Sequence, residues 1–160
     1  MNPRTQTLLQ TLENADWFSC VGKRDIADVN YAKSWLDAVS HCVGEDWKYV
    51  HREGRSIISS SVYKKSKTRC DQWNDTIDML KNPVSKLVQR KAASVMELNH
   101  LPKEFGWSVA GDLINAALEC EYSDVVDPGF FTTTIVDIYL KGHFPCGWEG
   151  KYPEGKLVVY

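Results

Sequence analysis

The sequence lacks the segments that mark exported and membrane-spanning proteins. It contains no run of about 18 apolar residues, and the chain does not open with the cationic segment and apolar stretch of a secretory signal. Its cysteines are scattered and odd in number, which argues against a disulfide framework and indicates reduced thiols. They are Cys20, Cys42, Cys70, Cys120 and Cys146. We therefore expect a protein of the cytoplasm.

Signature motifs of the main enzyme classes are missing as well. The sequence has no GxxxxGK[ST], GxGxxG, HExxH or GxSxG motif and no paired CxxC, so phosphate-binding loops, zinc-protease helices and hydrolase elbows are disfavoured. His143 and Cys146 form the closest His/Cys pair, but a structural zinc needs four ligands. We expect no metal, no cofactor and no catalytic residues.

The composition that is present belongs to one ordinary folded domain. A length of 160 residues matches a single domain of usual size. Hydrophobic residues make up 43% and charged residues 25%, which excludes a disordered or fibrous chain. We expect one domain that spans residues 1–160.

The net charge of −2 is distributed unevenly along the chain. Residues 48–91 carry eleven Lys or Arg and four acids, a net of +7, whereas residues 1–47 carry −3 and residues 92–160 carry −6. Such separation steers association with a charged partner. Packing of acidic helices against basic ones explains the same pattern, and the sequence leaves both explanations open.

Apolar residues recur at helical spacing through most of the chain. Asn2 and Pro3 supply a capping residue and a first-turn proline. The same pair at Asn82-Pro83 predicts a kink or short break, and Asp127-Pro128 predicts the start of another helix. The predicted helices cover residues 3–15, 32–43, 46–62, 70–81, 84–98, 102–120 and 128–142.

The tail, residues 143–160, changes character because glycine and proline recur there. Pro153-Glu154-Gly155 predicts a turn, so residues 148–152 and 156–160 are expected to form a hairpin. A lone hairpin is marginal in water, and residues 17–21 are the candidate third strand. The expected fold class is mainly α: a single-domain bundle of about six to seven helices in residues 1–142, with a small C-terminal antiparallel β-hairpin in residues 143–160.

Two functional hypotheses come from residue types alone. Cys146 lies between proline and glycine near His143, where an exposed thiolate could act as an enzyme nucleophile, although free cysteines are more often buried. The basic segment 48–91, with Tyr63 and Trp73 beside Lys64–Arg69, could contact phosphates and stack on a base. The net acidic charge and the lack of a nucleic-acid-binding signature make nucleic acid an unlikely partner.

Aromatic and glycine-rich strings are spaced along most of the chain. They are residues 17–22 (WFSCVG), 34–38 (SWLDA), Trp47, Trp73-Asn74, and a tail with Gly142-His143, Pro145-Cys146-Gly147-Trp148, Gly150, Pro153 and Gly155. In this arrangement the chain resembles small bacterial immunity proteins, the cytoplasmic antidotes of polymorphic and contact-dependent growth inhibition toxin systems. The resemblance implies that the protein binds and neutralises the C-terminal domain of one cognate toxin, often a nuclease, without catalysis of its own. It transfers no site residues, because contacts in such proteins vary with the toxin.

Charge then predicts where such a toxin binds. Carboxylates in the last third of the chain would stand in for nucleic-acid phosphates in front of a basic nuclease. The predicted partner-binding residues are Asp112, Glu119, Glu121, Asp124 and Asp127. The competing surface is the basic stretch Lys64–Arg69, which suits an acidic toxin.

Overall fold

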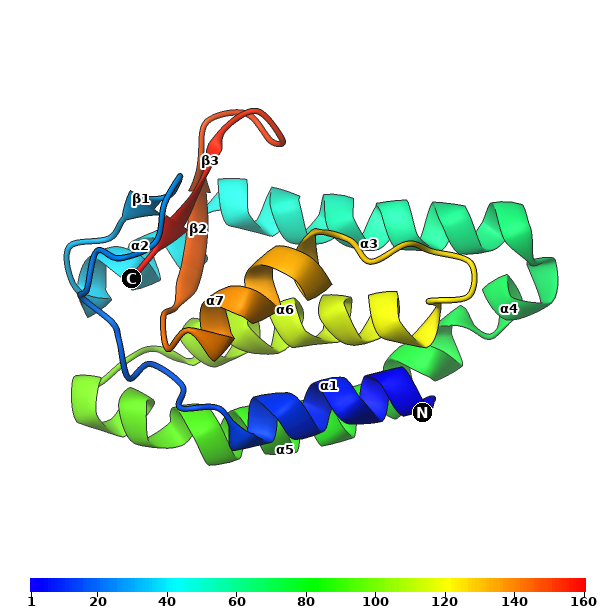
Figure 1. Ribbon diagram of the computed structural model, residues 1–160, viewed down its shortest axis with the longest axis horizontal. Helices are drawn as coiled ribbons and strands as arrows, with labels where there is room; N and C mark the ends of the chain where they lie inside the picture. The colour runs from blue at the N-terminus through cyan, green and yellow to red at the C-terminus, as the bar shows by residue number, and fades with distance from the viewer.

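Helices dominate the computed structural model, which describes residues 1–160 (Figure 1). They are α1 (Pro3–Asn14), α2 (Trp35–Cys42), α3 (Glu45–Lys65), α4 (Lys67–Asp71), α5 (Trp73–Asn99), α6 (Lys103–Glu121) and α7 (Val136–Leu140). A π-helical turn, η1 (Phe131–Ile135), leads directly into α7, and the strands are β1 (Asn30–Tyr31), β2 (Pro145–Glu149) and β3 (Lys156–Val159). The predicted fold class, mainly α with a minor β part, is confirmed.

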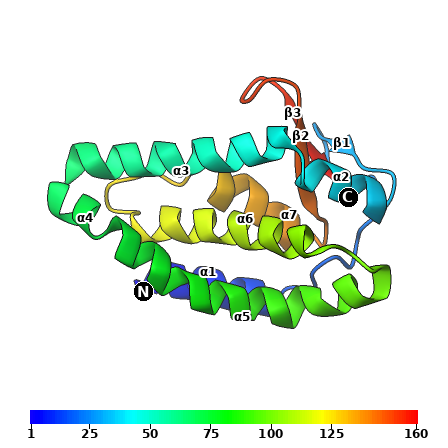
Figure 2. The same cartoon turned by 180° about the vertical axis from the view of Figure 1, so that it is seen from behind.

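Helix α6 is the central element of the helical part. Seen from behind, it lies between α3 and α5 (Figure 2). On the other face α7 lies in front of α6, and α1, which contacts both α6 and α5, lies in front of α5 (Figure 1). Eleven of its 19 residues are buried. A helix that is covered on several sides buries polar side chains as well as apolar ones. The predicted contact residues Asp112 and Glu119 are among the buried residues of α6.

The amino terminus is fixed by the capping residue that the sequence predicts. The side chain of Asn2 accepts a hydrogen bond from the backbone N–H of Thr5, and Pro3 occupies the first turn of α1. The amide of Asn2 also donates to the carbonyl oxygens of Cys120 and Glu121. The start of α1 is thereby tied to the end of α6.

Of the kink or short break predicted at Asn82-Pro83, the break does not occur. Helix α5 continues from Trp73 to Asn99 with Pro83 inside it. The proline removes one backbone hydrogen bond, but Leu80, Val84 and Leu87 keep one buried stripe across it. Burial of these side chains outweighs the loss, because each contributes about 1.5–3 kcal/mol.

The sheet has the strand order β1-β3-β2, with β2 antiparallel and β1 parallel to the central strand β3. The hairpin is therefore confirmed, although its first strand covers Pro145–Glu149 instead of 148–152. The third strand is Asn30–Tyr31, and the expectation for residues 17–21 is wrong. Those residues form turns with Trp17 and Phe18 buried, because Phe18 packs edge-on against Phe144 in an aromatic cluster.

Candidate functional site

Asp112, the first predicted contact residue, lies in the interior. One oxygen of its fully buried carboxylate accepts a hydrogen bond from the hydroxyl of Tyr139 (2.7 Å), and the other lies 2.5 Å from Nε2 of His51. Burial raises the pKa of Asp112, and the contacts with His51 and Tyr139 counteract that rise. The cluster joins α3, α6 and α7, so Asp112 is not accessible to a protein partner.

His51 is the member of this cluster that reaches a surface hollow. With Cys42 and Ser108 it lines a space of about 380 Å³ between α3 and α6. A carboxylate-bound imidazole can accept a proton from a nucleophile, but burial raises the pKa of Cys42 to about 12. The hydroxyl of Ser108 accepts a hydrogen bond from Nε1 of Trp47 (3.1 Å). These contacts support a role in holding the helices together.

Glu119, the second predicted contact residue, is also interior, with 4% of its surface exposed. Its carboxylate accepts hydrogen bonds from the backbone N–H groups of Gly129, Phe131 and Thr132 at 2.9–3.1 Å. It therefore caps the start of η1 from a neighbouring helix. This contact corrects the expectation that Asp127-Pro128 begins the helix, because the first helical turn forms at Phe131.

The other three predicted residues lie at the end of α6 and beyond it. Glu121 is half-buried and accepts hydrogen bonds from the backbone N–H of Asn2 (3.0 Å) and the hydroxyl of Thr5 (2.6 Å). Asp124 is exposed and pairs with Arg69, which lowers the pKa of Asp124. Asp127 is exposed.

The expected five-carboxylate surface is therefore corrected. Asp112 and Glu119 are interior, and Glu121 and Asp124 are held by groups of the same chain. Only Asp127 keeps a fully available charge, which is too little to imitate a phosphate backbone. The physical reason is that α6 is central, so its carboxylates satisfy buried donors.

Cys146 and His143 do not form a nucleophile pair in this structure. The thiol of Cys146 is fully buried and donates to the carbonyl of Val158 (3.4 Å), and burial raises its pKa well above the usual range. His143 is 1% exposed, and its Nε2 lies 2.6 Å from the carboxylate of Asp25. Both residues anchor the tail. No group of three or more His, Cys, Asp or Glu side chains is placed to hold a metal ion.

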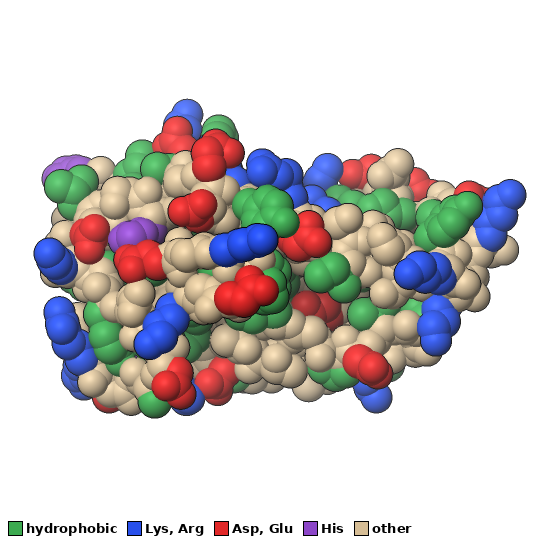
Figure 3. Space-filling view, turned by 90° about the horizontal axis from the view of Figure 1, so that it is seen from above, with side chains coloured by type: hydrophobic (Ala, Val, Ile, Leu, Met, Phe, Trp, Pro, Cys, Tyr) green, Lys and Arg blue, Asp and Glu red, His purple; other side chains and the backbone are tan.

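The competing basic stretch lies at the surface. Lys64 and Lys65 end α3, and Lys67 begins α4; all three are exposed, and none forms an ion pair. Seen from above, Lys and Arg side chains lie at this end of the molecule, with hydrophobic side chains among them, as well as elsewhere on the same face (Figure 3). We call the surface formed by Tyr63, Lys64, Lys65 and Lys67 the basic tip.

The same helix leaves large apolar side chains uncovered. Tyr49, Ile57 and Tyr63 of α3 are 46%, 52% and 66% exposed. Tyrosine is enriched at protein–protein contact surfaces. Ile57 is apolar but lies outside the buried stripe of α3, which consists of Trp47, Val50, Gly54, Ile58 and Val62.

Comparison of the chain with protein-family models, curated proteins and solved structures finds no match. None of the helices combines the length and the apolar character that a bilayer crossing requires.

Proposed function

We propose that the protein is a bacterial immunity protein that acts in the cytoplasm, where it binds a cognate toxin C-terminal domain one-to-one and blocks it without catalysis. The observation that carries the proposal is the outer face of α3, where exposed tyrosines adjoin the unpaired lysines of the basic tip. Exposed aromatic residues supply most of the affinity of such contacts. Separated charge supplies fast, selective association.

The charge of this face indicates the kind of toxin surface that binds it. Lys64, Lys65 and Lys67 carry three charges that no partner within the chain neutralises. An acidic toxin face complements them, whereas the basic active-site face of a nuclease is repelled. We therefore expect the toxin to present carboxylates to α3 and α4.

Asp71 and Asp75 favour a protein partner over a nucleic acid. They are exposed on α4 and α5, directly after the basic tip in the sequence. A continuous row of phosphates would meet these carboxylates as well as the lysines, and the repulsion would offset part of the attraction. A folded partner can place its own charges to match both signs.

The test uses tagged protein in its native host, with mass spectrometry of the proteins retained at moderate salt. We expect the C-terminal domain of a large secreted toxin, encoded next to this protein, in a one-to-one complex. Co-expression should also protect cells from that domain. Failure to protect against the encoded domain, or retention of DNA or RNA instead of protein, contradicts the proposal.

Charge reversal locates the surface. Lys64→Glu/Lys67→Glu should slow association with the purified toxin domain at least about tenfold at low salt, with a smaller effect at high salt. The matched control is Lys23→Glu/Lys33→Glu, which reverses two exposed lysines outside α3 and α4. Equal effects of the two double variants would exclude the basic tip as the contact surface.

A further inference from the structure

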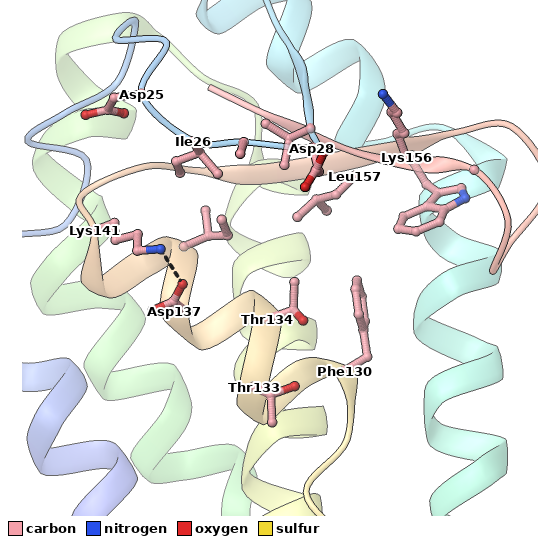
Figure 4. A pocket seen from close by; sticks show the side chains of 15 residues that line it. Asp25, Ile26, Asp28, Phe130, Thr133, Thr134, Asp137, Lys141, Lys156 and Leu157 are labelled. Carbon is pink, nitrogen blue, oxygen red and sulfur yellow. Dashed lines mark ion pairs between the residues drawn. The ribbon is translucent and has the colours of Figure 1, made fainter.

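Surface hollows lie on both faces of the helical part. The hollow between the sheet and α7 has a volume of about 470 Å³ (Figure 4). The charged residues of its wall are three aspartates and two lysines, and Asp137 pairs there with Lys141 at 2.8 Å. Such mixed charge does not select a partner of one sign.

The opposite face of α6 is uncovered. Seen from behind, α6 lies in view between α3 and α5 (Figure 2). A hollow of about 380 Å³ lies on its α3 side, and another of about 280 Å³ lies on its α5 side. Trp107 of α6 lines both hollows. We call the two hollows, together with the face of α6 between them, the α6 groove.

The floor of the α6 groove is apolar and low. Trp107 is 70% exposed, and Ala110 and Ile114 follow it at helical spacing and are partly exposed. A Cβ at Gly106 or Gly111 would meet no atom closer than 3.6 Å, so packing within the chain does not require glycine at either position. Glycine permits the close approach of another backbone.

The walls of the α6 groove carry more positive than negative charge. Lys48 lines the α3 side and Lys103 the α5 side, whereas Glu104 is the one carboxylate among the residues that line the two hollows. Arg52 is exposed one turn after Lys48 and forms no ion pair. The exposed contact of Lys48 with Glu45 (3.5 Å) is of a kind that contributes little.

Arg55 adds a cation that lacks a counter-charge. It follows Lys48 by seven residues, so both lie on the same side of α3. Its Nε donates to Oδ1 of Asn115 in α6 (3.1 Å), and no carboxylate pairs with its guanidinium. The terminal nitrogens donate to no group of the chain and are not enclosed by it. A carboxylate from outside the chain would supply the missing counter-charge in the bidentate geometry that arginine favours.

We propose that the α6 groove binds an amphipathic helix of a partner protein, with Asp or Glu on both sides of its apolar stripe. The apolar stripe packs around Trp107, and the carboxylates lie against Arg55 and Lys103. The floor from Lys103 to Ile114 is about 16 Å long at 1.5 Å per residue, which corresponds to about three turns of the bound helix. The inference does not rest on the toxin proposal, because that proposal uses the outer face of α3.

The test selects 15-residue peptides from a randomised display library on the wild-type protein. Peptides that also bind Ala110→Glu are removed, since this variant places a carboxylate on the floor of the groove at a partly exposed position. We expect enriched peptides with apolar residues at i, i+3 or i+4, and i+7, and with a net negative charge. Recovery of no peptide, of basic or neutral peptides, or of peptides without the helical spacing would overturn the proposal.

Charge reversal then tests the walls, with a fluorescein-labelled enriched peptide and its anisotropy as the readout. Arg52→Glu/Lys103→Glu should weaken binding about tenfold or more at low salt and less at high salt. Both positions are exposed, so the fold is kept. The matched control Lys23→Glu/Lys33→Glu reverses two exposed lysines elsewhere and should bind as the wild type does. Equal binding by the two double variants would overturn the proposal.

Two further measurements separate the α6 groove from the basic tip. Lys64→Glu/Lys67→Glu should bind the peptide as the wild type does, and a loss as large as that of Arg52→Glu/Lys103→Glu would overturn the proposal. The indole N–H signal of Trp107 in the NMR spectrum, assigned by its loss in Trp107→Phe, should shift in a saturable manner as the peptide is added. An unmoved signal would exclude the α6 groove as the binding site.

Discussion

At the residue scale, burial decides the chemistry of the cysteines. The thiols of Cys42, Cys120 and Cys146 are buried, and burial raises the pKa of each, to about 12 for Cys42. Since the thiolate is the reactive form, a pKa near 12 leaves about one thiol in 10⁴ ionised at pH 8. We expect Cys20 and Cys70, which are partly exposed, to react with a disulfide reagent in the native protein while the other three react only after unfolding.

The measurement is a thiol titration of the native and the denatured protein at pH 8, with the modified residues identified by mass spectrometry. Unfolding exposes the buried thiols to the reagent, so all five cysteines should react in the denatured protein. Fast labelling of Cys146 in the native state would contradict the expectation that it reacts only after unfolding and support the hypothesis that Cys146 is a nucleophile.

Glu119 provides a second prediction at this scale. Replacement by Gln puts an amide donor next to three backbone N–H groups, so at least one of them loses its acceptor. Glu119→Gln should lower the free energy of unfolding by about 1–3 kcal/mol, measured by urea denaturation. Asp127→Asn changes the same charge at an exposed position and should stay within about 0.5 kcal/mol of the wild type. Equal stability of the two variants would argue against the capping role.

At the element scale, close packing between α3 and η1 requires a glycine. A Cβ at Gly54 would lie 2.3 Å from Cε2 of Phe131, whose buried ring stacks on His51. Gly54→Ala should therefore destabilise the protein by about 1–3 kcal/mol, although alanine is the better helix former. In Gly106→Ala the new methyl meets only Met96, 3.6 Å away, and the helix should gain about 0.5–1 kcal/mol.

Urea denaturation of both variants checks whether Gly54→Ala lowers and Gly106→Ala raises the free energy of unfolding. Two stabilised variants would mean that Phe131 moves easily, and two destabilised variants would mean that the helix around Gly106 is also tightly packed.

The helices also show which features of the fold can be predicted from the sequence. Helical periodicity located α6, and the Asn2-Pro3 pair located the start of α1, because both signals are local. Pro83 is a local signal too, and it predicted a kink or short break. The apolar stripe that keeps α5 continuous is buried by helices that are distant in the sequence, so the local signal could not reveal it. Among the site residues, the carboxylates of Asp112 and Glu119 look like surface charges, because the partners that bury them, Tyr139 and the backbone of η1, come later in the chain.

At the scale of the whole molecule, the tail and the helices share one core. Phe144, at the start of the tail, packs edge-on against Phe105 of α6 with ring centroids 5.1 Å apart, and Tyr160 packs in the same way against Trp35 of α2. Phe144 and Tyr160 also exchange two backbone hydrogen bonds. These contacts connect the sheet to the helices through buried and partly buried rings, so we expect residues 1–160 to unfold as one unit.

Native-state hydrogen exchange tests whether the sheet and the helices unfold together. The slowest amides of β3 and of α6 should exchange with the same free energy, equal to that of global unfolding. Val158→Ala, at a fully buried position of the central strand, should lower both values by the same amount, about 1–3 kcal/mol. The control Lys156→Ala, at an exposed position of the same strand, should change neither. Faster exchange confined to the sheet would show instead that the hairpin opens by itself, because its contacts with Phe105 and Trp35 would then be too weak to couple the two parts.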